Sequence, residues 1–286
     1  MSKPLFDTDY FSDDSWERRV QSWLDHNGSN PFLEGNSRIV RQIMSHAESG
    51  LRMVINISAE ALLSFLAQRH YFNLYEEPVI GGKRRTPSQE RIKVDRLLGI
   101  GSQASDFYFG AVALGGTGVR FYGEYCMALK PSEIPGNTKI FDRDSYDLLL
   151  PPLSEVSNVG ALANQLRGSW KADVIDMLVR KVLPELQESK QLITTGTVSE
   201  MILRDQEFVE VQKLGPIRPE SIAEVRQSPD EIAIEARIQA RSNAGFAPTA
   251  VELRWLQQRR NVVEALERER ILCRVVTLHG RGYQWR

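Results

Sequence analysis

The sequence predicts a mixed α+β fold that begins with a helical segment and ends in a tail of helix and strand. Residues 51–57, 106–114 and 119–129 are rich in β-branched and aromatic residues, which favours strands. Apolar residues recur at helical spacing within residues 1–50 and 151–191. The chain has 286 residues, 42% hydrophobic and 26% charged, so it can bury a sizeable core and is neither collagen-like nor wholly disordered.

The first fifty residues are expected to be a helical lead-in. Apolar residues from Trp16 to Trp23 lie at helical spacing, and a second helix is expected before residue 50. The β-rich run 51–57 follows directly. Ser58 then has the position and residue type of a helix N-cap ahead of residues 59–66. We therefore expect a strand that runs straight into a capped helix.

The middle of the chain is expected to alternate loop, helix and strand. Residues 78–90 are loop-like, and Ser88 or Thr86 can cap a helix over residues 90–98. The runs 106–114 and 119–129 are joined by Gly115-Gly116-Thr117-Gly118, which predicts either a hairpin or two strands around a flexible loop. A further extended segment is expected at 138–141.

The last part of the chain is expected to return to helix and then to strands. Residues 151–191 carry an apolar helical face, and strands are expected at 201–203, 208–211 and 221–225. A charged helix over 251–270 and a strand over 271–278 complete the tail. We expect three regions: the lead-in at 1–50, a main domain at 51–230, and an extension at 231–286 that packs on the same unit.

Charge, cysteines and hydropathy limit the class of protein. The 36 basic and 37 acidic residues give a net charge of −1, which excludes a histone-like basic binder. Cys126 and Cys273 lack the spacing of a zinc site and are expected to be reduced thiols. Residues 1–19 lack the apolar core of a secretory signal, and no stretch is apolar enough for a membrane span. We expect a cytoplasmic protein without a membrane partner, with delivery by another secretion route left open.

Common catalytic motifs are missing from the chain. It has no P-loop, G-x-G-x-x-G, H-E-x-x-H, G-x-S-x-G or paired CxxC motif. The motifs that usually indicate P-loop NTPases, zinc proteases and ordinary serine hydrolases are therefore missing from this sequence. No metal site is expected from the sequence.

An ordered set of short motifs carries a family resemblance. Asn56-Ile57-Ser58 joins a strand to a helix, Lys83-Arg84-Arg85 lies in a loop, Phe107-Tyr108-Phe109 lies in a strand, and Glu200 precedes an apolar triplet. In this order residues 50–230 resemble the ADP-ribosyltransferase superfamily, and within it the DarT-type enzymes that modify nucleic acid. Those enzymes have His-x-Thr, an Arg-bearing loop, a Phe-Tyr-Phe-like strand and a late strand-leading Glu. The segment 142–145 is similar to their Thr-Asp-x-Asn segment.

The resemblance implies a split, mostly antiparallel sheet and NAD as the substrate. Breaking the bond between nicotinamide and ribose passes through an oxocarbenium-like transition state, which a carboxylate can stabilise. The implied roles are Glu200 as the catalytic carboxylate, Asn56 and Ser58 as contacts to the nicotinamide riboside, Tyr108 and Phe109 as pocket walls, and Arg84 or Arg85 as a phosphate clamp. Asn56 and Ser58 stand where the family has histidine and threonine.

The same resemblance implies a toxin, effector or defence component. Its acceptor would be nucleic acid or protein, and such a protein can have a neutralising protein partner. A single sequence does not show whether the acceptor is nucleic acid or protein.

Two other functions stay open on the sequence. Asp173, Glu200, Glu210, Gln212 and Lys213 loosely match a magnesium-dependent nuclease, in which acidic groups hold the metal and a lysine assists the attacking water. The aromatic and basic residues of 279–286 can instead serve a non-catalytic binding protein. Each motif also has a plain structural alternative, since aromatic strand residues are commonly core and charged loop residues are commonly solvated.

Overall fold

The computed structural model describes residues 38–40, 42, 50–76, 87–188, 193–203 and 208–276, with the side chains of 184–188 excepted. Most of the expected lead-in at 1–50 therefore lies outside the described residues. The basic loop with Arg84 and Arg85 and the tail residues 277–286 also lie outside them. None of the described helices is long and apolar enough to cross a membrane.

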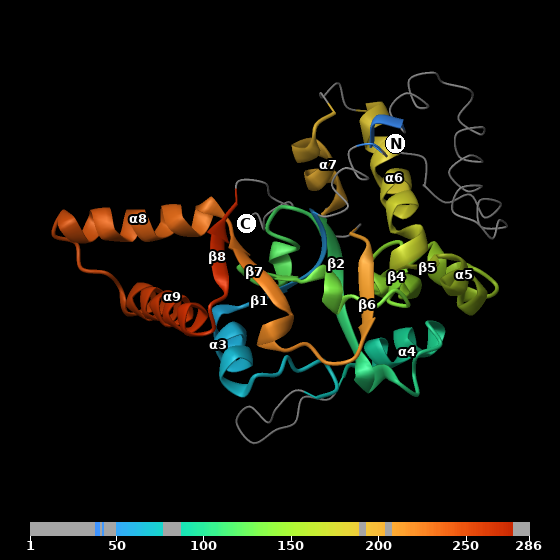
Figure 1. Ribbon diagram of the computed structural model, residues 1–286, viewed down its shortest axis with the longest axis horizontal. Coiled ribbons are helices and arrows are strands. Elements are labelled where there is room, and N and C mark those ends of the chain that lie inside the picture. Colours follow the sequence, from blue (N-terminus) through green and yellow to red (C-terminus); the bar gives the residue numbers. More distant parts are fainter. Residues whose placement is uncertain are drawn as a thin grey trace.

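One large sheet forms the centre of the fold (Figure 1). Its strand order is β5-β4-β6-β2-β1-β3-β7-β8, and every neighbouring pair is antiparallel except β7 and β8. A mixed fold with a mostly antiparallel sheet is confirmed. Each strand is hydrogen-bonded to its neighbours from one edge of the sheet to the other. The split that was expected in the sheet is therefore not a gap in the hydrogen bonding between strands. The strands are β1 Leu51–Ile57, β2 Phe107–Leu114, β3 Tyr125–Leu129, β4 Lys139–Phe141, β5 Arg167–Ser169, β6 Glu210–Leu214, β7 Ile222–Gln227 and β8 Leu272–Val275.

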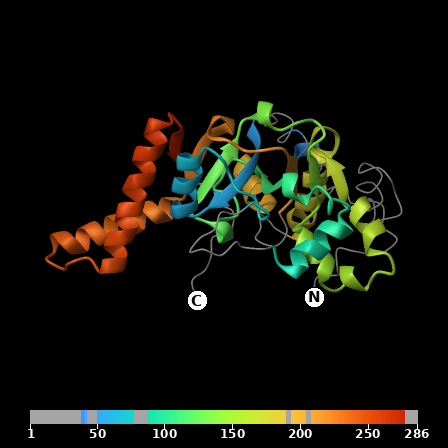
Figure 2. The same ribbon diagram turned by 90° about the horizontal axis from the view of Figure 1, so that it is seen from below.

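Helices lie around this sheet and extend beyond one of its edges. α6 and α7 pack on each other, α7 contacts β2, and α9 packs on α3. Figures 1 and 2 show α8 and α9 projecting from the edge that carries β8. Since β8 pairs with β7, the end of the chain joins the same sheet. The helices are α3 Ala59–Gln68, α4 Gln89–Leu97, α5 Val159–Gln165, α6 Trp170–Glu188, α7 Thr195–Ile202, α8 Pro229–Asn243 and α9 Ala250–Arg268.

Two helices begin where capping residues predict. The Ser58 hydroxyl accepts a hydrogen bond from the Ala61 N–H at 3.2 Å and begins α3. The Ser88 hydroxyl accepts one from the Arg91 N–H at 3.1 Å and begins α4. Each serine satisfies one N–H that the first turn of a helix leaves unpaired. The predicted strand that runs into a capped helix is therefore confirmed at β1 and α3.

The hairpin reading of residues 106–129 is wrong, and the alternative of two strands around a loop is correct. β2 and β3 both pair with β1, on its opposite sides, and not with each other. β1 has the sequence LRMVINI and six buried residues, which suits the middle of a sheet covered on both faces. The connection over 115–124 has to pass β1, and Gly115, Gly116 and Gly118 take positive φ angles there.

The strand expected at 201–203 is also wrong. Residues 195–202 form α7, and Thr194 and Thr197 make reciprocal side-chain to backbone hydrogen bonds at its start. Val198, Met201 and Ile202 are buried at helical spacing. A short apolar run does not distinguish strand from helix by itself, and here the cap and the buried face decide. Glu200 consequently lies on a helix.

Candidate active site

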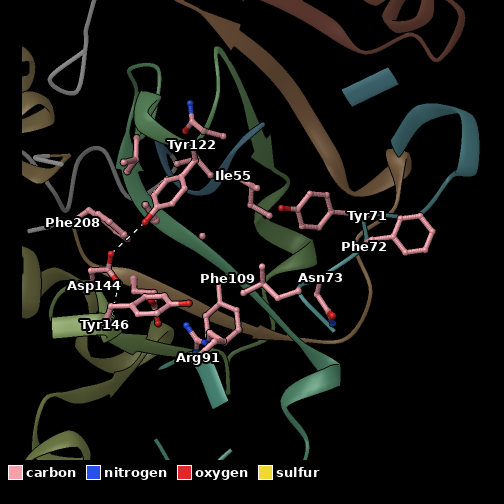
Figure 3. A pocket seen from close by; sticks show the side chains of 17 residues that line it. Ile55, Tyr71, Phe72, Asn73, Arg91, Phe109, Tyr122, Asp144, Tyr146 and Phe208 are labelled. Atoms are coloured by element: carbon pink, nitrogen blue, oxygen red, sulfur yellow. Dashed lines mark hydrogen bonds between the residues drawn. The ribbon is translucent and has the colours of Figure 1, made fainter. Parts of the chain in front are cut away.

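A cavity of about 210 Å³ opens over the middle of the sheet (Figure 3). Residues of β1, β2 and the start of β6 form one part of its wall. The segment 71–74, α4, the 119–122 turn, residues 144–146 and Phe208 form the rest. The lining residues are Val54, Ile55, Asn56, Tyr71, Phe72, Asn73, Leu74, Arg91, Phe109, Gly110, Ala111, Val119, Tyr122, Asp144, Tyr146, Phe208 and Glu210.

Glu210 is the buried carboxylate of this cavity. It begins β6 and is only 4% exposed. The Ser145 hydroxyl donates to its Oε2 at 2.8 Å, and the Gln212 amide donates to its Oε1 at 2.9 Å. Burial raises the pKa of Glu210 to about 7, and the nearby Arg91 charge opposes this rise. The group therefore changes its charge near neutral pH.

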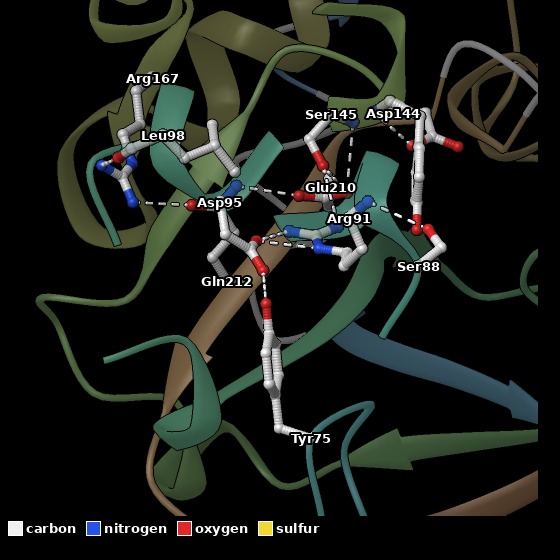
Figure 4. A network of polar contacts seen from close by, with 11 residues as sticks. Tyr75, Ser88, Arg91, Asp95, Leu98, Asp144, Ser145, Arg167, Glu210 and Gln212 are labelled. Carbon is white, nitrogen blue, oxygen red and sulfur yellow. Dashed lines mark hydrogen bonds and ion pairs between the residues drawn. The ribbon is translucent and has the colours of Figure 1, made fainter. Parts of the chain in front are cut away.

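Arg91 is the buried cation beside this carboxylate (Figure 4). Its Nε donates to Asp95 Oδ1 at 2.9 Å, its Nη2 pairs with the same oxygen, and its Nη1 donates to the Ser145 hydroxyl at 3.3 Å. The Tyr75 hydroxyl donates to the other oxygen of Asp95. The guanidinium carbon lies 4.0 Å from the centre of the Phe109 ring. Ser145 thus connects Arg91 to Glu210.

Aromatic side chains supply the flat walls of the cavity. The Tyr122 hydroxyl donates to Asp144 at 3.3 Å, and the Tyr122 and Phe208 rings meet edge to face with centroids 6.4 Å apart. Phe109 and Tyr146 lie near the Arg91 guanidinium (Figure 3). Such walls suit a planar ring, since aromatic faces stack on one another with an offset.

Asn56 lines the cavity and also holds a loop in place. Its amide group donates to the Thr117 carbonyl at 2.8 Å and to the Gly123 carbonyl at 3.0 Å. Both amide hydrogens are therefore used, and the remaining polar atom is Oδ1, an acceptor. A Cβ at Gly118 would lie 2.0 Å from that Oδ1, so the backbone can approach only as glycine. Asn56 thereby fixes the loop that carries Tyr122.

The structure brings together only part of the site expected from the sequence. Asn56 and Phe109 line the cavity. Ser58 is an exposed helix cap and does not line it. Glu200 is exposed on α7, so it is not a strand-leading glutamate, and it does not line the cavity. Arg84 and Arg85 lie outside the described residues.

Tyr108 also differs from its expected position as a pocket wall. Its hydroxyl donates to Glu76 at 2.8 Å, its ring lies near those of His70 and Tyr71, and it does not line the cavity. Successive residues of a strand point to opposite faces of the sheet, so Tyr108 and Phe109 cannot both face one cavity. Alternation within the strand could have shown this from the sequence.

Sequence reasoning missed the cation and five of the six aromatic residues that line the cavity, namely Tyr71, Phe72, Tyr122, Tyr146 and Phe208. Arg91 stands three residues after the helix cap Ser88, and Tyr122 and Tyr146 lie in short 3₁₀ turns. Glu210 entered the sequence analysis only as part of the nuclease set. The strand expected at 208–211 places Glu210 inside a strand, whereas β6 begins at Glu210 in the structure, which is the position that the resemblance requires.

Of the residues of the nuclease hypothesis, Gln212 contacts Glu210, but Asp173, Glu200 and Lys213 do not line the cavity that Glu210 lines. Asp173 accepts a hydrogen bond from the Ser169 N–H at 2.6 Å at the start of α6, and Glu200 is exposed on α7. The Lys213 ammonium donates to the Gly215 carbonyl at 3.0 Å. Within the described ranges, no group of three His, Cys, Asp or Glu residues is arranged to hold a metal ion.

No family model, curated protein or solved structure matches the chain. The fold and the cavity therefore define the site: a buried carboxylate beside a guanidinium, in an aromatic pocket over the centre of an antiparallel sheet.

The raised pKa of Glu210 predicts that stability falls as pH rises. The folded pKa of about 7 exceeds the ordinary 4.5, so the folded chain binds this proton more tightly than the unfolded chain. This stabilisation is fully present below pH 4.5 and is lost as pH passes through about 7. It amounts to roughly 3 kcal/mol, since one pKa unit corresponds to about 1.4 kcal/mol.

Urea unfolding at about pH 5 and about pH 8 measures this effect. The Glu210→Gln variant cannot titrate at this position, so its stability should change less between the two pH values. An equal change in both proteins would contradict the prediction.

Proposed function

We propose that this protein is an NAD-dependent ADP-ribosyltransferase in which Glu210, and not Glu200, is the catalytic carboxylate. The observation that carries the proposal is the convergence of Asn56, Arg91, Phe109 and Glu210 on one cavity. They follow one another in the order of the resemblance: strand, arginine, aromatic strand and late strand-leading glutamate. Arg91 is the arginine in this order, but it lies on α4 and not in the loop where Arg84 and Arg85 were expected to bind phosphate. The acceptor is nucleic acid or protein, as expected for a toxin, effector or defence component.

The chemistry follows from the position of Glu210. When the bond between nicotinamide and ribose breaks, nicotinamide leaves with the electron pair and the ribose carbon becomes positive. The ionised Glu210 carboxylate stabilises that charge. An acceptor atom then bonds to the carbon and gives its proton to Glu210. A pKa of about 7 lets this carboxylate accept a proton near neutral pH.

The size and walls of the cavity fit one end of the dinucleotide. A volume of about 210 Å³ is below the roughly 300 to 1,000 Å³ of sites that enclose a whole ligand, so only the nicotinamide end would be enclosed. Phe109, Tyr122 and Tyr146 offer faces on which the pyridine ring can stack. Arg91 is already bonded to Asp95 and Ser145, so its role is to hold the site together and to balance the Glu210 charge.

Labelled NAD tests the proposal. The protein is incubated with NAD labelled in its adenylate part and with separate pools of nucleic acid and protein. We expect free nicotinamide to appear and one pool to become labelled. Magnesium-dependent degradation of nucleic acid without NAD, abolished by EDTA, would support the nuclease instead. If the protein does not consume NAD and NAD does not raise the protein's melting temperature, the result would support a non-catalytic binding protein.

A further inference from the structure

Three polar side chains, Arg167 on β5 and Gln212 and Glu210 on β6, form a chain of hydrogen bonds (Figure 4). Gln212 is fully buried on β6, two residues after Glu210, and donates through Nε2 to Glu210 Oε1 at 2.9 Å. Arg167 on β5 donates through Nη2 to Gln212 Oε1 at 2.9 Å. The other arm of Arg167 donates to the Leu98 carbonyl at 2.7 Å. Arg167 does not line the cavity.

Arg167 decides which way the Gln212 amide points. A glutamine amide can turn over and exchange its donor for its acceptor, whereas a guanidinium only donates. The atom that faces Arg167 must therefore be the amide oxygen, which leaves the NH₂ group to face Glu210. With Arg167 removed, the amide oxygen could turn towards Glu210 and accept a hydrogen bond from its protonated form, which would favour that form over the ionised one. The Leu98 carbonyl keeps the guanidinium in place.

We propose that Arg167 is a positioning residue that acts through Gln212 to keep a hydrogen-bond donor on the Glu210 carboxylate. Its consequence for catalysis rests on the proposed function, but the contact itself does not. A donor favours the ionised form of a carboxylate. Arg167 and Gln212 therefore favour the ionised form of Glu210 and oppose the effect of burial, although neither residue lines the cavity.

Arg167 can also act on Glu210 directly through its charge, and the two routes differ in a double-mutant cycle. If Arg167 acts through Gln212, replacing Arg167 changes the pKa of Glu210 little in a protein that already lacks Gln212. If Arg167 acts only through the electric field of its charge, the pKa changes caused by the two single substitutions add. The cycle consists of Arg167→Met, Gln212→Met and the double variant. Each methionine keeps a long apolar side chain at its buried or half-buried position.

Titration of Glu210 in the full chain is the measurement. Glutamate labelled with ¹³C at the side-chain carboxyl gives an NMR signal for each residue, and the Glu210 signal is the one missing in Glu210→Gln. We expect each single variant to raise the pKa of Glu210 by about one, and the double variant to raise it no further. An unchanged titration in Arg167→Met, or fully additive shifts, would overturn the proposal.

A conservative variant covers the case in which Arg167→Met does not fold. Arg167→Lys keeps the charge but offers one nitrogen to two acceptors. We expect its Glu210 pKa to lie between the wild-type and Gln212→Met values. A wild-type titration that is kept in Arg167→Lys/Gln212→Met would assign the effect to charge and reject the relay.

The titration needs no NAD and is independent of the proposed function. If NAD is consumed, the pH profile of nicotinamide release should move upward with the measured pKa in each variant. If NAD is never consumed, the proposed function fails while the NMR result still decides the role of Arg167.

Discussion

Glu210→Gln is expected to lower NAD-dependent transfer by at least about 100-fold, the lower end of what general acid–base groups contribute. The amide has almost the volume of the carboxylate and can still accept the Ser145 hydrogen bond. It cannot carry the negative charge that stabilises the ribose cation, and it cannot take the acceptor's proton. The initial rate of nicotinamide release at saturating NAD measures the loss. The melting temperature shows whether the variant is folded.

Glu200→Gln is the matched control for this experiment. It is the same chemical change on an exposed residue of α7 that does not line the cavity. Its rate should stay within about twofold of the wild type, as is usual for surface substitutions away from a site. A large loss in Glu200→Gln together with full activity in Glu210→Gln would reverse the assignment and return the carboxylate role to Glu200.

Signals contained within a few residues explain the parts of the fold that the sequence predicts correctly. The strand at 51–57 and the caps Ser58 and Ser88 depend on a β-rich run and on a hydroxyl beside the first turn of a helix. These interactions are local, so the residue types carry them. The strand at 138–141 was predicted for the same reason and is β4 in the structure, one residue shorter.

The choice between two glutamates needed information that is not local. Glu200 and Glu210 both stand close to short apolar runs, and the resemblance asks for a glutamate that leads a strand. Residues 195–202 become a helix through a threonine pair that lacks the usual acidic partner, so the cap is hard to recognise. Residues 210–214 become a strand by pairing with β2 and β4, which lie far away in the sequence. Only the assembled sheet distinguishes the two.

The cavity itself depends on the order of strands. The sequence allowed β2 and β3 to be neighbours in a hairpin, but β1 lies between them. That arrangement places Asn56 of β1 beside the loop that carries Tyr122, and Phe109 of β2 beside Arg91. The apolar sequence of β1 is consistent with its place inside the sheet, but a single sequence gives only the apolar content of each strand and not its neighbours.

Arg91→Met is expected to destabilise the protein by about 3 to 5 kcal/mol, because it removes one partner of a buried ion pair. Arg91 and Asp95 are 2% and 1% exposed, so the remaining carboxylate would be buried with Tyr75 as its hydrogen-bond donor. The free energy of unfolding from urea denaturation measures the loss. Arg96→Met is the matched control: it removes an exposed arginine from the same helix and should change the stability by less than about 0.5 kcal/mol.

The double variant Arg91→Met/Asp95→Leu separates the cost of an unpaired charge from that of lost packing. Replacing both members of a buried ion pair by apolar residues is often close to neutral, so the double variant should regain at least half of the stability that Arg91→Met loses. The Tyr75 hydroxyl then loses its acceptor, which costs on the order of 1 kcal/mol and limits the recovery. A double variant no more stable than Arg91→Met would show that the unpaired Asp95 charge is not the source of the loss in Arg91→Met.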